Sequence, residues 1–329
     1  MNAADRPIDT FSFEAERLME EFPPAWRDRN KRVVYEIACP PGCRHGGHLT
    51  YMRWRAMALP EHSNPAAAIL CTERRQDFYD YLPILRESGA VEWHVNFADP
   101  HLFVAYGSGL FAQDELQVAE HPCLGALKEA LTARGSSPMT VEKDRPTPIL
   151  VMGAERRCRV ATERNHAEGR PYGLYGNAFA VAPAEAIRRA TTRIEPPTVT
   201  NLIAMAAPSG GRGLYTASEI ERVMTTAYTG FRAAVLQTGD APTVVHTGFW
   251  GCGAFGGNRV LMALLQVLAG QMAGVERLVF HTFDADGTDA FDAAVGWVDD
   301  VLSASSIATR TLMDRVAAEG FEWGVSDGN

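Results

Sequence analysis

The chain has 329 residues, of which 46% are hydrophobic and 22% are charged, and its formal net charge at pH 7 is -9. This size and apolar content suffice for one large buried core, or for a main domain with a smaller N-terminal part. The net negative charge repels polyanions, so direct nucleic-acid binding is not expected, and a nucleotide site has to rely on local backbone N–H groups and arginines.

The apolar stretches, the N-terminal residues and the cysteines together predict a cytoplasmic protein. No stretch approaches 18 uninterrupted apolar residues, and residues 1–9 lack the basic-then-apolar pattern of a signal peptide. We therefore expect no membrane partner. The six cysteines are too few and too scattered for a disulfide scaffold in a chain of this length, which favours reduced thiols.

The first part of the chain differs in pattern from the rest. Residues 13–22 are predicted to form a short amphipathic helix closed by two prolines, residues 33–38 a strand, and residues 40–48 a loop. We expect residues 1–64 to be an N-terminal accessory segment.

From residue 65 onward, apolar strand candidates alternate with helices, which predicts an α/β fold with helices on both faces of a sheet. The predicted strands are residues 67–71, 93–98, 148–152, 199–204, 243–247 and 278–283. We assign residues 65–310 to the main domain and residues 311–329 to a C-terminal tail.

Two of the helices have clear ends in the sequence. Ser218 and Glu221 have the spacing of a capping box, and apolar residues then follow at helical spacing. Asn258 is a good N-cap for a second helix with a stripe of leucines, and Gly274 is predicted to end it.

A glycine-rich loop lies between the strand at 243–247 and the helix from Asn258. Five of the ten residues 248–257 are glycine. Glycine lets the backbone approach a ligand closely, and the following helix N-terminus offers unpaired N–H groups, so the loop suits a diphosphate. Trp250 and Phe255 could stack on a sugar or base. A tight strand-to-helix turn without a ligand is the alternative.

The loop also satisfies G-x-G-x-x-G, so an NAD-dependent dehydrogenase has to be weighed. That fold places an acidic residue about 20 positions on, at the carboxyl end of the next strand. Glu276 stands at the beginning of that strand and Asp284 comes late. These mismatches argue against a dehydrogenase, and no Gly-Lys-Ser/Thr follows as a P-loop requires.

Three sequence blocks resemble the poly(ADP-ribose) glycohydrolase family, and they occur in the family's order. Residues 247–257, TGFWGCGAFGG, are similar to the family's diphosphate loop TGNWGCGAFGG. Residues 95–99, VNFAD, and 113–115, QDE, are similar to its VDFAN and QEE signature. Gly153-Ala154-Glu155 with Tyr175 and Phe179 is similar to the segment that supplies a tyrosine beside the reacting ribose.

The resemblance implies a macrodomain-like mixed sheet and an ADP-ribosyl hydrolase that acts without a cofactor on ADP-ribose attached to another molecule, such as an ADP-ribosylated protein. It makes Glu115 the catalytic acid, with Asp99 at the distal ribose. Asp114 is assigned to ribose hydroxyls or to a structural bond, because adjacent helical side chains point about 100° apart. The implied ligand-binding residues are Phe97, Gln113, Tyr175, Phe179, Phe249, Trp250, Gly251, Cys252, Gly253, Ala254, Phe255, Gly256 and Gly257.

Asp114 and Glu115 also have a reading without catalysis, as acidic residues that complement a helix dipole. With the resemblance, the proton-transfer role of Glu115 is favoured, because cleavage of a glycosidic bond at a ribose needs a carboxylic acid beside the leaving atom.

The chain departs from the family pattern at several positions. Residues 103–105, FVA, replace a glycine triplet, and their bulk is expected to narrow the site. Asp99 replaces an asparagine, Asp114 a glutamate and Phe249 an asparagine. The added acidity favours a cationic leaving group, so arginine-linked mono-ADP-ribose is preferred over the polymer. A poly(ADP-ribose) glycohydrolase and a non-catalytic ADP-ribose reader remain alternatives, and carboxylate, serine or nucleobase linkages stay open.

Cys39, Cys43, His45 and His48 stand at a C-x3-C-x-H-x2-H spacing. Cysteine and histidine are the usual zinc ligands, but this spacing matches no known finger. We expect no catalytic metal, and whether the four residues bind zinc is left open, as is the oligomeric state. His246 and His281, near predicted strand ends, are interpreted as core or supporting histidines.

Overall fold

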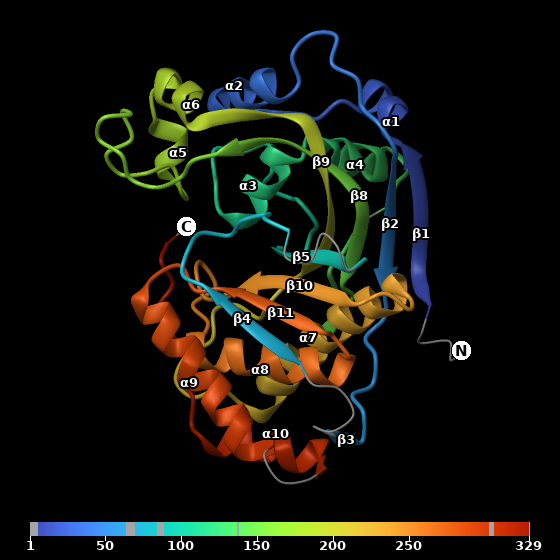
Figure 1. Cartoon of the computed structure of the whole chain (residues 1–329), viewed down its shortest axis with the longest axis vertical. Helices are drawn as coiled ribbons and strands as arrows, with labels where there is room; N and C mark the ends of the chain where they lie inside the picture. Colours follow the sequence, from blue (N-terminus) through green and yellow to red (C-terminus); the bar gives the residue numbers. More distant parts are fainter. Residues whose placement is uncertain (1–5, 64–69, 84–88, 137, 303–305, 329) are drawn as a thin grey trace.

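The computed structural model describes residues 6–63, 70–83, 89–136, 138–302 and 306–328. Its centre is an eight-stranded sheet in the order β1-β2-β8-β9-β5-β10-β11-β4 (Figure 1). The strands are β1 (Pro7–Glu14), β2 (His48–Trp54), β4 (Cys71–Arg75), β5 (Val91–Phe97), β8 (Ile149–Val160), β9 (Thr191–Met205), β10 (Thr243–Gly248) and β11 (Arg277–His281).

The sheet is mixed, with a parallel and an antiparallel half. The pairs from β9 through β5, β10 and β11 to β4 are parallel, whereas β1, β2, β8 and β9 pair antiparallel. Two small ribbons lie outside it, formed by β3 (His62–Ser63) with β12 (Ile307–Ala308) and by β6 (Val141–Glu142) with β7 (Arg145–Pro146).

Helices cover both faces of the sheet, as the alternation of strands and helices predicts (Figure 1). One face carries α7 (Ala217–Thr238), α8 (Arg259–Ala273), α9 (Ala285–Leu302) and α10 (Thr309–Ala318). The other carries α1 (Ala15–Glu21), α2 (Arg29–Ala38), α3 (Gln113–Glu120), α4 (Pro122–Ala133), α5 (Ala178–Val181) and α6 (Ala184–Ala190). The predicted α/β architecture, a mixed sheet with helices on both faces, is thereby confirmed.

Alternation along the strands divides the buried side chains between two cores. Ile203 and Met205 of β9 enter the core beneath α7 and α8, whereas Leu202 and Ala204 enter the core beneath α4. Successive side chains of a strand point to opposite faces, so a central strand has to be apolar at consecutive positions.

Five of the six predicted strands coincide with β5, β8, β9, β10 and β11, with shifts of a few residues at their ends and long extensions of β8 and β9. The predicted strand at 67–71 falls mainly outside the described residues, and β4 begins at Cys71.

The strand predicted at 33–38 is wrong, because these residues belong to α2. Asp28 caps this helix by accepting hydrogen bonds from the backbone N–H groups of Asn30 and Lys31 at 2.9 and 3.1 Å. Val34 and Ala38 are buried on one helical face, and this packing overrides the strand preference of the apolar run.

The helix predicted at 13–22 is observed as α1, which begins two residues later than predicted because residues 13 and 14 are the end of β1. β1 and β2 are strands of the central sheet, and the domain boundary near residue 65 stays a prediction.

The capping residues predicted for two helices can be compared with the ends of α7 and α8 in the structure. In α7 the capping box is made by Thr216 and Glu219, so the predicted pair Ser218 and Glu221 is wrong by two residues. In α8 both ends are as predicted. Asn258 Oδ1 accepts from the N–H of Leu261 at 3.0 Å, and Gly274 closes the helix with a φ of 82°.

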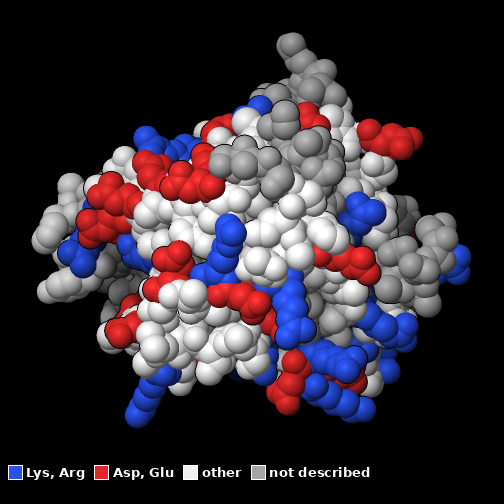
Figure 2. Space-filling view, turned by 90° about the horizontal axis from the view of Figure 1, so that it is seen from below, with Lys and Arg blue, Asp and Glu red and all other residues white. Residues whose placement is uncertain are grey.

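The described helices include none with the length and apolar character needed to cross a membrane. The face seen from below carries Lys and Arg together with Asp and Glu (Figure 2).

Candidate functional site

The two best-matching sequence blocks meet at the carboxyl ends of β5 and β10. These strands are parallel neighbours, with His94 paired to His246. The ring of Phe97, at the end of β5, reaches to within 3.5 Å of where a Cβ on Gly248 would lie. Because parallel strands end at the same sheet edge, the segment after β5 and the glycine loop after β10 share one side of the molecule.

Gln113, the first residue of α3, fixes that helix on β5. Its Oε1 accepts from the backbone N–H of Phe97 at 2.8 Å, and its Nε2 donates to the carbonyl of Val95 at 3.0 Å. The side-chain amide satisfies two backbone groups at the end of the strand, so the direction of the first turn of α3 is set. Both ends of the side-chain amide are thus hydrogen-bonded to the backbone of β5, and a ligand contact of Gln113 stays a prediction.

Asp114 and Glu115 follow in the first turn and are buried, with 6% and 4% exposure. Asp114 Oδ1 accepts from Asn96 Nδ2 at 3.0 Å. Glu115 Oε2 accepts from the N–H of Ala112 at 3.1 Å, so its carboxylate bends back over the helix N-terminus. The two acids therefore have separate partners, as their helical positions require.

Burial favours the protonated form of both acids. It raises the pKa of Asp114 to about 8, and the charge of Glu115 adds to this effect. Burial also raises the pKa of Glu115, whereas the ammonium group of Lys31 lowers it. A raised carboxyl pKa suits an acid to donate a proton, because it increases the share of the protonated form.

Lys31 is a residue of this site that sequence reasoning missed. It lies on α2, is 1% exposed, and donates from Nζ to the carbonyl of Tyr106 at 2.6 Å. Burial lowers its pKa to about 8, against the opposing charges of Glu115 and Asp114. The assignment of 33–38 to a strand hid this contact. Asp28, a residue type that often caps helices, was the signal in the sequence for a helix here.

Tyr175 lies beside the same helix start. Its hydroxyl is hydrogen-bonded to the backbone of Gln113, and its pKa is raised to about 12, mainly by burial, with the charges of Asp327 and Glu115 adding. Tyr175 as a whole residue is 38% exposed. Its hydroxyl is therefore engaged inside the protein while part of the residue lies at the surface.

The glycine loop has a tightly determined backbone. Gly251 has a φ of 77°, and a Cβ there would lie 2.4 Å from that of Ala207, so no other residue fits. Trp250 is 1% exposed and donates from Nε1 to the carbonyl of Met205 at 2.8 Å. Its ring belongs to the core, so any ligand at the loop meets backbone N–H groups before this indole.

The C-terminal tail lies against this loop, which sequence reasoning did not anticipate. The N–H of Asp327 donates to the carbonyl of Gly253 at 3.5 Å, and Asp327 Oδ2 lies 3.1 Å from where a Cβ on Gly253 would be. Trp323 stacks on Tyr215 with ring centroids 4.2 Å apart, which anchors the tail. A carboxylate therefore lies where the resemblance expects a diphosphate.

Other predicted ligand residues have different surroundings. Phe179 is fully buried and stacks on Phe111 at 3.9 Å, inside the core below α2. Phe249 packs edge-on against Phe280 at 5.0 Å, with the guanidinium of Arg259 over its ring. The remaining predicted members, Cys252, Ala254, Phe255, Gly256 and Gly257, lie on the loop.

The segment that replaces the glycine triplet keeps a glycine-like backbone. Phe103 has a φ of 53° and its side chain is fully buried in the core beneath α4. Its ring therefore does not narrow the site, contrary to the expectation of added bulk. Val104 is 48% exposed and is the large side chain of this segment that reaches the surface. Asp99 accepts from the N–H of His101 at 3.1 Å, and its charge reaches both Asp114 and Glu115.

Three buried histidines lie on neighbouring strands of the sheet, His94 on β5, His246 on β10 and His281 on β11. His94 and His246 stack at 4.3 Å, and His246 Nε2 lies 2.7 Å from Glu92 Oε2. Burial lowers the pKa of His94 well below its usual value and that of His281 to about 3, so these two rings are neutral. The potential ligand atoms of Glu92, His94 and His246 lie within 4.8 Å of one another, as do those of Cys39, Cys43 and His45.

Residues 149–290 match the family model described as "Poly (ADP-ribose) glycohydrolase (PARG), Macro domain fold". The predicted family resemblance is confirmed. The matched segment of this PARG-like macrodomain runs from β8 into α9 and contains Tyr175 and the whole glycine loop, whereas Glu115 precedes it.

Solved structures of bacterial PARGs are similar to the chain. The glycohydrolase from Thermomonospora curvata is 18% identical, with a TM-score of 0.45 over 87% of this chain and 85% of that one. The same enzyme bound to the inhibitor ADP-HPD is 17% identical, with a TM-score of 0.44 over 86% and 84%. The enzyme from Deinococcus radiodurans in complex with ADP-ribose is 14% identical, with a TM-score of 0.42 over 88% and 95%.

Proposed function

We propose that the protein is an ADP-ribosyl hydrolase that cleaves the bond between ADP-ribose and a modified group. The observation that carries this proposal is Glu115, a carboxylic acid 4% exposed, with a raised pKa, at the sheet edge that also bears the glycine loop. The match of residues 149–290 to the PARG family supports the same activity.

In the proposed reaction, Glu115 donates its proton to the leaving atom as the bond at the ribose breaks. The transition state has oxocarbenium character, so a protonated acid at this point lowers the barrier, and water completes the cleavage. Lys31 balances the charge that Glu115 acquires, because its ammonium favours the ionised carboxylate. Asp114, held by Asn96, is a positioning residue or a partner of ribose hydroxyls.

The glycine loop is proposed to hold the diphosphate. Its backbone is preformed by Gly251, and the N-terminus of α8 begins directly after it at Asn258. Unpaired N–H groups and the helix dipole favour an anion there even though the chain is acidic overall. Tyr175, a residue 38% exposed beside the start of α3, is proposed to pack against the ribose.

As the substrate we propose a single ADP-ribose on a protein side chain, with arginine first. Val104 puts an exposed side chain where the family has glycine, which disfavours a further polymer unit. Asp99 adds negative charge near the acids, which attracts a guanidinium leaving group. The ring of Phe103 gives no support to this choice, because it lies in the core.

The test compares ADP-ribose release from arginine-linked mono-ADP-ribosylated protein and from poly(ADP-ribose), using the unmodified protein and Glu115→Gln. We expect faster release from the arginine-linked substrate and a loss of at least about 100-fold in Glu115→Gln, with ADP-ribose affinity kept within about tenfold. Faster polymer degradation would contradict the substrate choice. ADP-ribose binding without any release would leave a reader macrodomain.

A further inference from the structure

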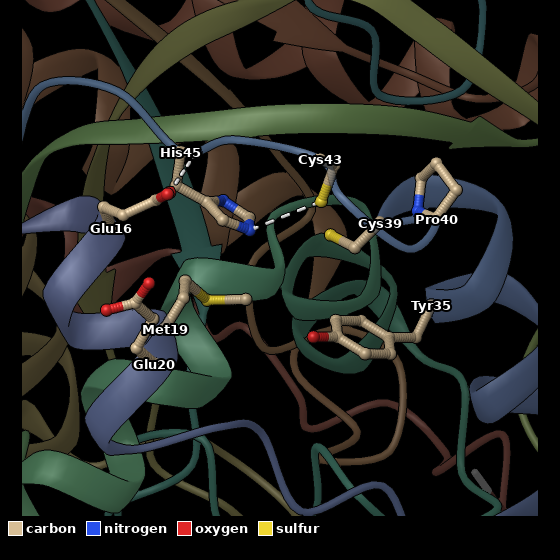
Figure 3. A pocket seen from close by; sticks show the side chains of 8 residues that line it. All are labelled: Glu16, Met19, Glu20, Tyr35, Cys39, Pro40, Cys43 and His45. Atoms are coloured by element: carbon tan, nitrogen blue, oxygen red, sulfur yellow. Dashed lines mark hydrogen bonds between the residues drawn. The ribbon is translucent and has the colours of Figure 1, made fainter.

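A second cluster of reactive side chains lies far in sequence from the acids, around a cavity of about 240 Å³ (Figure 3). The cavity lies between α1, the end of α2 and the loop that leads into β2. Cys39, Cys43 and His45 line it together with Glu20 and Tyr35. Cys39 is the C-cap residue of α2, so this end of the helix brings a thiol to the cavity.

The donor atoms of these three residues have the spacing of a metal site. Cys43 Sγ lies 3.8 Å from His45 Nε2, and all three potential ligand atoms lie within 4.8 Å of one another. Zinc bonds of about 2.3 Å to sulfur and about 2.0 Å to nitrogen, at a tetrahedral angle, put such atoms about 3.6 Å apart. Small side-chain rotations are therefore enough to bind an ion.

The ring of His45 is oriented for this role. Its Nδ1 lies 3.2 Å from Glu155 Oε2, so a proton on Nδ1 leaves the lone pair of Nε2 facing the thiols. Glu155 is itself fixed, since it accepts from Arg157 at 2.7 Å and from the N–H of Gly46 at 2.9 Å. A carboxylate behind the imidazole is the arrangement that orients metal-binding histidines.

The loop is held in place independently of any ion. The N–H of His45 donates to Glu16 Oε2 on α1 at 2.6 Å, and the N–H of Cys43 donates to the carbonyl of Pro40 at 3.0 Å. Arg157 on β8 donates to the carbonyl of Arg44. Contacts from α1 and β8 thus keep the three donors together, which reduces the conformational cost of binding an ion.

We propose that Cys39, Cys43 and His45 bind a zinc ion that fastens the end of α2 to the loop before β2. Two thiolates and an imidazole select zinc over the oxygen-preferring magnesium and calcium, and binding releases the two thiol protons. The cavity leaves space for a fourth ligand such as water. His48, the fourth residue of the sequence pattern, is exposed at the start of β2 and lies outside this cluster.

The experiment measures zinc per chain by elemental analysis after reconstitution with zinc and removal of the excess. We expect about one zinc ion in the unmodified protein and in the matched controls His48→Ala and Cys71→Ser, which change an exposed histidine and an exposed thiol. Cys43→Ser and His45→Ala should lose it. Glu155→Gln keeps all three ligands, and its zinc affinity should fall by roughly 10- to 100-fold.

Cobalt substitution gives a readout that does not depend on stability. Cobalt bound at Cys39 and Cys43 must show sulfur-to-metal charge-transfer absorption, which a site made of Glu92, His94 and His246 cannot give. Three results would overturn the proposal: no zinc in the reconstituted protein, zinc retained in both Cys43→Ser and His45→Ala, or a Cys39–Cys43 disulfide in the protein as isolated under reducing conditions.

Discussion

Asp114 and Glu115 are adjacent acids with separate partners, and the two partners define different tests. Asp114 is tied to Asn96 inside the protein, whereas Glu115 bends over the N-terminus of α3. Replacing the carboxyl group of Asp114 by an amide should therefore change mainly the stability of the protein, and the same replacement at Glu115 should change mainly its turnover.

We expect Asp114→Asn to be more stable than the unmodified protein at alkaline pH. Burial raises the pKa of Asp114 to about 8, far above the value of about 3.9 in an unfolded chain, so the folded state binds more protons between these values. Its contribution to stability is present below about pH 4 and falls as pH rises to about 8, by at most about 1.4 kcal/mol per pH unit. The asparagine still accepts from Asn96 and has no proton to lose.

The measurement is urea unfolding of both proteins at pH 5, 7 and 9. The stability difference in favour of Asp114→Asn should grow from pH 5 to 7 and change little above pH 8. A difference that does not vary with pH would mean that Asp114 is ionised in the folded protein.

Lys31 gives a second prediction at this scale, and it depends on the proposed activity. Its ammonium lowers the pKa of Glu115, so Lys31→Met should raise that pKa. A general acid works in its protonated form, so the alkaline limb of the pH–rate profile should move to higher pH. Lys31→Arg keeps the charge and serves as the control, and an unmoved limb in Lys31→Met would exclude the coupling.

Among the elements, the tail after α10 makes the least expected contact. The carboxylate of Asp327 lies at Gly253, where the proposed site would hold a diphosphate. Two anions at one place repel each other, so ADP-ribose has to displace the tail or bind beside its charge.

Asp327→Asn should therefore bind ADP-ribose more tightly, by roughly 3- to 10-fold, a change that calorimetry resolves. Asp314→Asn on α10 makes the same change in net charge at an exposed position and should leave the affinity unaltered. Weaker binding by Asp327→Asn would show instead that the carboxylate contributes to the ligand site.

The strands and the ends of α8 could be predicted because local pattern and tertiary role agree there. An apolar run predicts β10, a cluster of glycines predicts the loop, and the cap Asn258 predicts the start of α8. The helix at residues 33–38 could not be predicted, because their apolar run also fits a strand. The cap Asp28 and the burial of one face against neighbouring elements make these residues helical.

For the candidate site, the sequence indicated Glu115 and the loop through family resemblance, and it could not indicate partners that come from distant segments. Lys31 and Asp327 reach the acids or the loop only through the fold, and the bond between Asn96 and Asp114 joins two segments of one matching block. Trp250 and Phe179 were predicted to bind the ligand from their positions in the sequence, and the structure places both side chains in the core. They lie within the matching blocks, but their side chains enter the core, and a sequence motif does not distinguish the two directions.

At the scale of the whole molecule, the N-terminal segment takes part in the central sheet. β2 pairs with β8 from Thr50 to Arg53, and β1 pairs with β2. Leu49, Tyr51 and Trp54 of β2 are nearly fully buried and belong to the cores on both faces. α2 adds Lys31 beside the acids.

From this arrangement we predict that a chain lacking residues 1–64 does not form a stable, active domain. Each large apolar side chain that loses its buried place costs about 1.5–3 kcal/mol, and several are lost together, which approaches the total of 5–15 kcal/mol that stabilises a typical domain. Removal of β2 also exposes the unpaired edge of β8, which favours aggregation. The measurement is urea unfolding and ADP-ribose release of residues 65–329 beside a chain that lacks only residues 1–5, which should behave like the unmodified protein. A cooperative unfolding transition and measurable release from residues 65–329 would show that the first 64 residues are an accessory segment after all, and would place the charge balance of Glu115 on groups other than Lys31.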